Sequence, residues 1–259
     1  MKIDCIIQAR MNSTRLPGKV LMSLNKDFTV LQHMINQLKF SKLIDSIIIA
    51  TTDLPDDDII EKEAKKLNLE CFRGKSDDVL DRYYQCAKKF NSKNIIRLTS
   101  DCPLIDPEIV DQVILDYKSE CFDYYTNVLN RTFPLGTDVE IFSFEVLEKI
   151  WNDATLPSER EHVTLFLKNK KSNLKIGNLE NSENLKNIRI TLDRKEDLIL
   201  IRKIISKISK KPILINDIRD LFLNEPSLQK INEHVVQNEG LLKSLKRDQN
   251  YQTFGNNLD

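Results

Sequence analysis

The first half of the chain alternates short apolar runs with segments whose apolar residues recur at helical spacing. Ile3 to Gln8 forms one apolar run, and Ser46 to Thr51 carries three consecutive isoleucines, as expected for a strand buried on both faces. Further strands are predicted at Leu69 to Phe72 and at Asn94 to Thr99. Strands separated by helices indicate an α/β fold with a mostly parallel sheet, in which ligands bind at the carboxyl ends of the strands.

Helices are predicted between these strands from apolar stripes and from capping residues. In the third of them, a purely structural interpretation makes Asp77 or Asp78 a helix cap and Asp81 and Arg82 an exposed pair, and contacts of this segment to a nucleotide are the alternative. The helices are expected at 30–38, from Pro55 to Asn68, from Asp77 or Asp78 onward, and from Asp106 onward.

The second half of the chain is less regular. Ser158 and Glu161 have the spacing of a capping box, which indicates a helix start. From about Leu241 the chain turns polar, so we expect a frayed tail over 241–259. The elements expected in this half are strands at Asp123–Asn127, Val139–Phe142, Lys175–Leu179 and Asn187–Leu192, helices at about 143–153, 158–169 and 198–208, and two short helices before Gly240.

The charge and the cysteines exclude several classes of protein. Thirty-nine basic and 39 acidic side chains cancel, with a pI of about 6.8, so no global field favours nucleic acid or an anionic membrane as a partner. The five cysteines are scattered and include no C-x-x-C, which argues against a disulfide framework and a zinc site. Asp4 interrupts the place where a signal peptide would turn apolar. A cytoplasmic protein is therefore expected.

The loop that follows the first strand, Gln8 to Leu21, carries three cations, two hydroxyls and a glycine. Such groups can bind phosphate, because cations and hydroxyls donate to it and Gly18 lets backbone N–H groups approach it. The loop is not a Walker loop, since Lys19 is followed by Val20 and no glycine lies five residues before Gly18. From charge alone, an ordinary basic surface loop remains the alternative.

Two aspartates are candidates for a magnesium site beside this loop. Asp101 follows the fourth strand, and Asp193 ends the last predicted strand just before a helix. Mg²⁺ prefers one or two carboxylates together with phosphate oxygens and water. Asp101 has the alternative role of closing an Asx-turn before Cys102. Asp193 has the alternative role of a helix cap, because Glu196 follows at capping-box spacing.

The order of residues in the first loop resembles a family signature. The segment Q-A-R-M-x-S-T-R-L-P-G-K-V-L looks like that of the cytidylyltransferases of the spore coat polysaccharide type. It is similar to P-A-R-x-x-S-T-R-L-P-G-K-P-L of CMP-Kdo synthetases, and sialate cytidylyltransferases have a looser version. Four further segments resemble this family in the expected order: R-G-K-S-D-D-V-L-D-R-Y, R-L-T-S-D-C-P, P-L-G-T-D-V-E and R-E-H-V-T.

The resemblance implies roles for individual residues. It implies catalytic roles for Arg10, Lys19 and Asp101, and Mg²⁺ bound by Asp101 and Asp193. The last of these departs from the family pattern V-D-T-P-E-D-L, since Arg194 and Lys195 replace Thr-Pro. The implied nucleotide contacts are Gln8, Ala9, Arg10, Ser13, Thr14, Arg15, Lys19, Arg73, Ser76, Asp77 and Thr99. The implied acceptor contacts are Asp138, Glu140, Arg160 and His162.

The resemblance also implies a three-layer α/β/α fold of the nucleotide-diphospho-sugar transferase type. Since no linker or repeat divides the chain, we predict one domain over 1–240, with a nucleotide-binding half of about 1–120 and an acceptor-binding and dimerisation half of about 121–240. The implied reaction transfers CMP from CTP to an acidic sugar or a phosphate or phosphonate acceptor in surface polysaccharide synthesis. CTP and a small acceptor are the expected partners, and the protein is expected to be a homodimer.

Two other functions stay open from the sequence. A glycosyltransferase of similar fold would use a D-x-D metal motif, whose letters Asp56-Asp57-Asp58 satisfy at a helix start. A nucleotide-binding protein without turnover is the third reading. His162 is open too, as a base, a substrate contact or an ordinary surface or core histidine.

Overall fold

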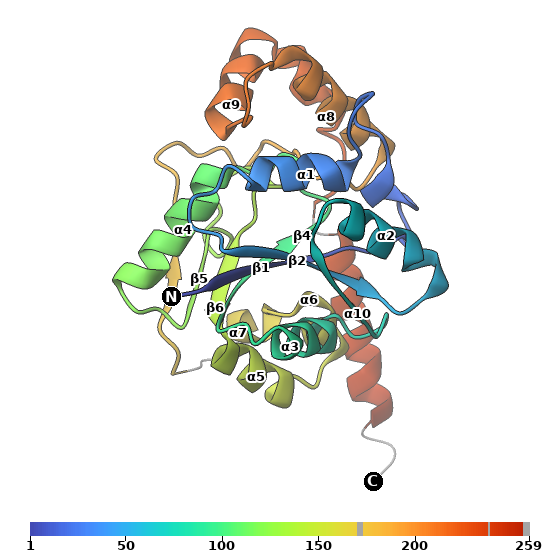
Figure 1. Ribbon diagram of the computed structural model, residues 1–259, viewed down its shortest axis with the longest axis vertical. Coiled ribbons are helices and arrows are strands. Elements are labelled where there is room, and N and C mark those ends of the chain that lie inside the picture. The colour runs from blue at the N-terminus through green and yellow to red at the C-terminus, as the bar shows by residue number, and fades with distance from the viewer. Residues whose placement is uncertain (170–172, 238, 256–259) are drawn as a thin grey trace.

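The computed structural model describes residues 1–169, 173–237 and 239–255, and it has three layers (Figure 1). A seven-stranded sheet lies between two sets of helices. The strands are β1 (Ile3–Gln8), β2 (Ser46–Thr52), β3 (Glu70–Gly74), β4 (Asn94–Thr99), β5 (Tyr124–Thr126), β6 (Glu140–Ser143) and β7 (Ile176–Asn178). The helices are α1 (Val30–Leu38), α2 (Asp58–Lys66), α3 (Val79–Lys89), α4 (Pro107–Ser119), α5 (Phe144–Asp153), α6 (Pro157–His162), α7 (Leu165–Asn169), α8 (Lys195–Lys207), α9 (Ile215–Asn224) and α10 (Glu239–Gly255), with 3-10 turns η1 (Lys19–Leu21), η2 (Pro55–Asp57) and η3 (Pro226–Ile231).

The sheet is mixed and mostly parallel, which confirms the predicted fold class. Its strand order is β3-β2-β1-β4-β6-β5-β7. The strands β1, β2, β3 and β4 run parallel to one another, whereas β6 is antiparallel to both of its neighbours, β4 and β5. The first four strands were predicted within two residues of their ends, because β1, β2 and β4 are largely apolar runs buried between helices.

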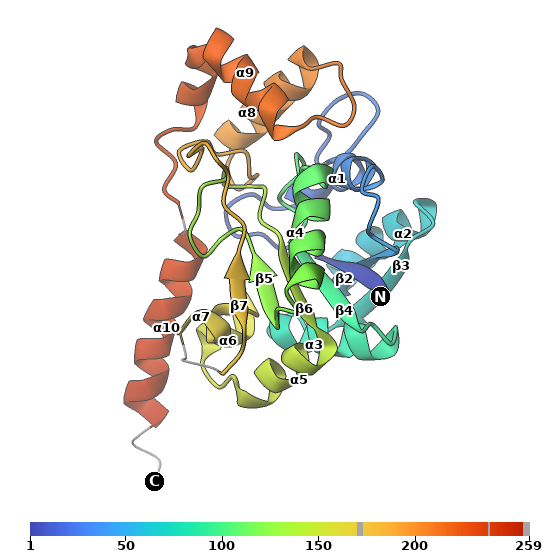
Figure 2. The same ribbon diagram turned by 90° about the vertical axis from the view of Figure 1, so that its left-hand side faces the viewer.

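Two hydrophobic cores cover the two faces of the sheet. Cys5 and Ile7 of β1 face the first core with α1, α2 and α4, while Ile6 faces the second core with α3 and α5. This alternation follows from the two-residue period of a strand. The helices α8 and α9 extend the first core beyond α1, as Figure 2 shows from the side.

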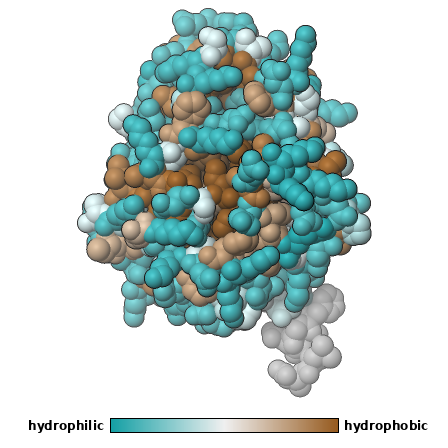
Figure 3. Space-filling model, viewed as in Figure 1, coloured by the Kyte–Doolittle hydropathy of each residue, from teal (hydrophilic) through white to brown (hydrophobic). Residues whose placement is uncertain are grey.

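On the face seen in Figure 3, hydrophobic residues gather in a band across the middle, and polar residues cover most of the rest. Among the residues that the structure describes, no helix is both long enough and apolar enough to span a membrane.

The strand order changes direction between β1 and β4. After β1 the chain builds β2 and β3 on one side, and then returns to place β4 on the other side. Gln8 and Thr99 end these two strands and are register partners. The loops that follow them therefore meet at one edge of the sheet, which is where α/β proteins bind ligands.

Three predictions in the second half are wrong in detail. The helix expected at 158–169 is two helices, because Val163 takes a positive φ of 52° between α6 and α7. The first of these begins at Pro157, and Glu159, not Glu161, accepts the backbone N–H groups of Thr155 and Leu156. The strand expected at Asn187–Leu192 is reduced to one bridge between Arg189 and Leu135.

The frayed tail is also wrong for the described part, because α10 is a helix packed against α6 (Figures 1 and 2). Among the side chains of α10 that the structure describes, the buried ones are Ser244 and Asp248, four residues apart. The Asp248 carboxylate accepts the N–H of Ser158 at 2.9 Å. A buried face made of polar side chains leaves no apolar stripe in the sequence, so periodicity did not mark this helix. Residues 256–259 lie outside the described ranges.

Gly136 should be essential for docking the segment before α8. It has a φ of +112°, and a Cβ there would lie 2.6 Å from the Thr191 nitrogen and 2.7 Å from the Ile190 carbonyl carbon. We expect Gly136→Ala to lower the free energy of unfolding by about 2 kcal/mol or more, through strain and overlap. Urea denaturation measures this. Gly240→Ala is the matched control, since its Cβ would have only an ordinary contact, with Arg15; equal midpoints for both variants would contradict the prediction.

Candidate active site

The loop after β1 is held in shape by its own backbone. The Met11 carbonyl accepts N–H groups from Ser13 at 2.9 Å and from Gly18 at 2.8 Å. Gly18 has a φ of 71° and begins η1, a conformation that favours glycine. Leu16 and Val20 are buried and fix the loop to the first core. The cations of the loop are therefore displayed from a defined backbone.

Asp57 fixes the start of the same loop. Its carboxylate accepts the N–H of Met11 at 2.7 Å and both the N–H and the hydroxyl of Thr52. Its neighbour Asp58 forms an ion pair with Arg73. The Asp56-Asp57-Asp58 run thus stabilises the β2–α2 region. Its geometry does not support the D-x-D metal motif of a glycosyltransferase.

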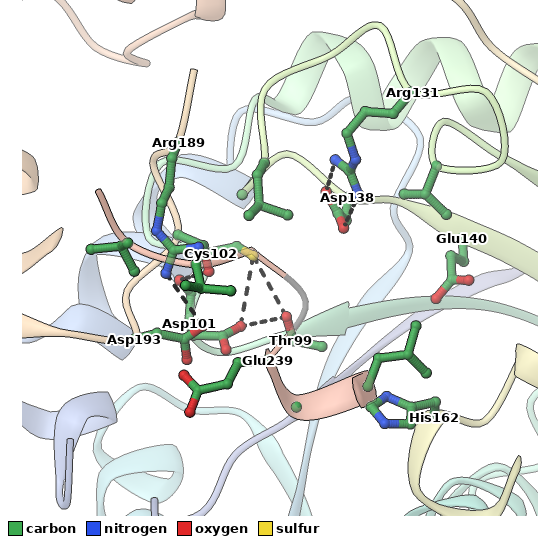
Figure 4. A pocket seen from close by; sticks show the side chains of 18 of the residues that line it. Thr99, Asp101, Cys102, Arg131, Asp138, Glu140, His162, Arg189, Asp193 and Glu239 are labelled. Atoms are coloured by element: carbon green, nitrogen blue, oxygen red, sulfur yellow. Dashed lines mark hydrogen bonds and ion pairs between the residues drawn. The ribbon is translucent and has the colours of Figure 1, made fainter. Parts of the chain in front are cut away.

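Lys19 lies at the centre of the site. Its ammonium donates to Asp101 Oδ2, to Asp193 Oδ1 and to the Leu192 carbonyl, each at 2.8 Å. Figure 4 shows the side chains of Asp101 and Asp193 next to each other. The structure thus brings together the two aspartates that the sequence suggested as metal ligands.

Both aspartates are held in the ionised form. Burial alone would raise the pKa of Asp101, but the Lys19 ammonium outweighs burial and lowers it. The same balance, with Arg15 as a further donor at 2.5 Å, lowers the pKa of Asp193. The second oxygen of Asp101 accepts the Thr99 hydroxyl at 2.5 Å. Its side chain therefore serves the site, and the hydrogen bonds do not describe an Asx-turn.

Asp193 does not cap the following helix. The backbone N–H groups of Asp193 and Arg194 both donate to the Asp197 carboxylate, at 2.9 Å each. Asp193 instead contacts three cations, namely Arg15, Lys19 and Arg189. Its side chain is consequently available to the site.

Two clefts meet at this cluster. The smaller has a volume of about 150 Å³ and the larger about 440 Å³, and Arg15, Thr99 and Asp101 line both. Nine of the residues predicted to bind nucleotide or metal line the smaller cleft: Gln8, Ala9, Arg10, Ser13, Thr14, Arg15, Lys19, Thr99 and Asp101. The larger cleft has Asp193 on its wall as well.

Asp138 and Glu140 line the larger cleft, together with His162 (Figure 4). Asp138 binds Arg131 through two bonds of 2.7 Å. Glu140 accepts from Arg97, Tyr124 and Thr164 and lies 3.5 Å from Lys168. Burial would raise the pKa of Glu140, but Lys168 and Arg97 lower it to about 2. These carboxylates are fixed by ion pairs.

His162 lies at the edge of the larger cleft. Its Nε2 is 3.0 Å from the Ser244 hydroxyl of α10. Burial lowers the pKa of the imidazole below its ordinary value of 6.5, so the ring is mostly neutral at pH 7. A neutral imidazole at this position can exchange a hydrogen bond with a ligand, and its helix partner fixes its orientation.

Four predicted residues lie outside both clefts: Arg73, Ser76, Asp77 and Arg160. Arg73 binds Asp58 and Glu61 on α2. Arg160 binds the Asp78 carboxylate and the Trp151 carbonyl. Both arginines thereby connect secondary-structure elements.

Several arginines that line the clefts were not among the predicted site residues. Arg97, Arg131 and Arg189 line the larger cleft, and Arg82 lines the smaller one. The expectation that Arg82 is exposed is wrong, since its relative exposure is 1%. Arg97 was marked in the sequence as a single charge within the apolar strand β4, and Arg82 lies in the family-like segment R-G-K-S-D-D-V-L-D-R-Y.

Comparison with known proteins identifies the family. A sequence model of the cytidylyltransferases matches residues 5–246. The chain belongs to the cytidylyltransferase family. It is therefore a CTP-dependent nucleotidyltransferase, as the first loop predicted.

The relatives agree with this assignment. The chain is 38% identical to the spore coat polysaccharide biosynthesis protein SpsF of Bacillus subtilis over 80% of this chain and 88% of that protein. A cytidylyltransferase structure from Leptospira borgpetersenii is 37% identical, with a TM-score of 0.84 over 88% of this chain and 96% of that chain. CMP-2-keto-3-deoxy-manno-octonic acid synthetase, solved with CTP, shares the fold at 17% identity and a TM-score of 0.60, over 80% of this chain and 99% of that chain.

Arg160 should matter for stability more than for nucleotide binding. Arg160→Ala removes a two-pronged ion pair with Asp78 and a bond to Trp151, so we expect the free energy of unfolding to fall by about 1–2 kcal/mol. The affinity for CTP, measured by calorimetry, should stay within about twofold, because Arg160 lies outside both clefts.

Arg219→Ala is the control for this variant, because Arg219 forms only exposed ion pairs, with Asp220 and Glu183, and should change neither quantity. A large loss of CTP affinity in Arg160→Ala at unchanged stability would show that this arginine reaches the ligand.

Proposed function

We propose that this cytidylyltransferase transfers CMP from CTP to an anionic acceptor, with release of pyrophosphate, in surface polysaccharide biosynthesis. The observation that carries the proposal is the Lys19–Asp101–Asp193 cluster at the junction of the two clefts. A phosphoryl centre at that junction would face phosphate-binding cations on one side and an acceptor on the other. The polysaccharide assignment rests on the likeness to SpsF.

The smaller cleft suits the triphosphate of CTP. Arg10, Arg15 and Lys19 line it, with hydroxyls from Ser13 and Thr14. Such donors stabilise the charge of transferring phosphates when they are fixed before the reaction. The CTP bound to the related CMP-2-keto-3-deoxy-manno-octonic acid synthetase supports a nucleotide in this position.

The chemistry asks mainly for positioning. An acceptor oxygen would attack the α-phosphorus of CTP, and the bond to the bridging oxygen of the β-phosphate would break as pyrophosphate leaves. The negative charge of the phosphates would be stabilised by Lys19, Arg10 and Arg15, which lowers the activation free energy of the transfer. Arg15 lines both clefts and so suits a role at the point of transfer.

Asp101 and Asp193 fit a magnesium ion bound together with the nucleotide. Both are ionised, and each places one carboxylate oxygen 2.8 Å from the same Lys19 nitrogen. Two carboxylates complete a Mg²⁺ site only with phosphate oxygens and water. Within the described ranges no group of three or more His, Cys, Asp or Glu residues is placed to hold a metal by itself. The ion would neutralise phosphate charge when bound. A remote structural neighbour, from Mycobacterium tuberculosis, was solved with manganese.

The larger cleft favours an acceptor that carries a carboxylate, phosphate or phosphonate. Of the residues that line it in the described part of the chain, six are cationic and five carry a carboxylate. Arg97, Arg131 and Arg189 keep their positions through ion pairs with acids. Guanidinium groups held in this way recognise planar and tetrahedral anions through paired N–H donors. Asp138, Glu140 and His162 would add contacts to acceptor hydroxyls.

We also propose a cytoplasmic homodimer. Leu223, Val236 and Leu242 are exposed on or beside the C-terminal helices, and a second copy of the chain would cover such residues. CTP as substrate favours the cytoplasm. Sedimentation of the pure protein at several concentrations measures the assembly, and a monomer throughout would refute the dimer.

The substrate is tested by measuring pyrophosphate released from each nucleoside triphosphate with Mg²⁺ and a panel of sugar acids, phosphates and phosphonates. We expect release from CTP alone, and only with an acceptor. Asp101→Ala should lower turnover by about 100-fold or more, because it removes a fixed charge at the transfer point.

Asp220→Ala is the matched carboxylate control for this assay, since Asp220 is exposed and remote from both clefts. Preference for another nucleotide would refute CTP as substrate. Binding of CTP without pyrophosphate from any acceptor would favour the nucleotide-binding protein without turnover.

Metal and nucleotide should bind together. Two carboxylates already paired with Lys19 hold Mg²⁺ poorly, so calorimetry of Mg²⁺ with the protein alone should give no tight binding. CTP should bind about tenfold or more tightly in Mg²⁺ than in EDTA, by reciprocal coupling. Equal CTP affinity in both buffers would remove Asp101 and Asp193 from a metal site.

A further inference from the structure

Arg82 is an unusual buried cation. It lies in α3 with a relative exposure of 1%, although a charged side chain on a surface helix is expected to reach water. Its side chain passes close to Gly74, where a Cβ would lie 3.3 Å from Arg82 Cγ. The guanidinium thus points inward and lies beneath the loop between β3 and α3.

The guanidinium has few partners for its donors. Nη1 donates to the Lys75 carbonyl at 2.6 Å, and the buried Nε has no partner in the structure. Over the described residues, no carboxylate lies within ion-pair distance of Arg82. Burial and the nearby Arg10 both lower the pKa of this group, and the more distant carboxylates of Glu161 and Asp57 offset this only in part.

Other buried cations of the protein are compensated. Lys19 pairs with Asp101 and Asp193. Arg189 pairs with Asp197 and lies 3.5 Å from Asp193. Because an unpaired buried charge is costly, a protein keeps one where a bound ligand supplies the counter-charge.

Arg82 lines the smaller cleft, beside Arg10, Arg15 and Lys19. The only carboxylate among the described residues lining that cleft is Asp101, and Lys19 pairs with it. We propose that Arg82 is a direct contact to a phosphate group of the bound nucleotide, with the free donors of its guanidinium directed at a phosphate oxygen. This inference rests on the proposed function, because it needs nucleotide phosphates in this cleft.

A purely structural role is the competing explanation. In that case Arg82 would hold the Lys75 carbonyl and shape the β3–α3 loop without touching ligand. The two roles differ in what a neutral side chain of similar length does. Loss of a phosphate contact weakens binding, whereas loss of a structural bond lowers the stability of the free protein.

The test compares the full chain with Arg82→Met and with Lys88→Met, a control on the same helix whose cation lies over Tyr84, away from the cleft. Calorimetry gives Kd for Mg-CTP and for tripolyphosphate, and thermal unfolding gives Tm without ligand. We expect Arg82→Met to weaken both ligands by about tenfold or more, since a charge-assisted contact is lost. Its Tm without ligand should equal or exceed that of the native chain, and Lys88→Met should bind as the native chain does.

Several results would overturn the inference. Kd for CTP within about twofold of the native value would remove Arg82 from the ligand. Weaker CTP binding with unchanged tripolyphosphate binding would place the contact on the nucleoside. If Arg82→Met fails to fold, Arg82→Lys decides, because native stability with weakened binding supports the contact and unchanged binding refutes it. Failure of the native chain to bind CTP would refute the proposed function itself.

Discussion

One ammonium group connects the parts of the chain that build the site. Lys19 comes from the loop after β1, Asp101 from the loop after β4, and Asp193 from the segment before α8. The sequence separations are 82 and 174 residues. Because Lys19 is buried, its positive charge needs carboxylates as partners in the free protein. The two acids can lie close to each other because the ammonium between them offsets their repulsion. Folding of the sheet edge and assembly of the site are thus one event.

The same ion pairs give the two clefts different electrostatic character. In the larger cleft, acids such as Asp138 and Glu140 each face an arginine, so the wall is nearly neutral and rigid. In the smaller cleft Asp101 stands against several cations, so positive charge is left over for phosphate. Under the proposed function, a triphosphate that enters there would let Lys19 exchange its carboxylates for phosphate oxygens. The two acids would then be free to bind a cation that arrives with the nucleotide.

The sequence predicted the first half of the fold well, because its strands, such as Ile3–Gln8, are apolar runs buried on both sides. The prediction failed where buried residues are polar or where an apolar segment does not form a strand. Helix α10 buries the polar residues Ser244 and Asp248, so its sequence has no apolar stripe from which the helix could be predicted. The segment Asn187–Leu192 has the composition of a strand, yet only one of its residues forms a bridge, to Leu135. Pairing partners of that kind lie far along the chain and leave no local pattern.

The site divides in the same way. Asp101 was predicted at the site because it follows β4, and sheet geometry brings the ends of parallel strands to one edge. Asp193 lies beside it although the strand predicted before Asp193 is only a single bridge. Arg82 was misassigned because a charge on a helix is normally solvated, and its burial depends on Gly74 lying beside it in space. The burial of a paired arginine, such as Arg189, is accounted for by the ion pairs that it forms with acids. Arg82 has no such ion pair, and the free-energy cost of its burial points to a negative charge that arrives with the ligand.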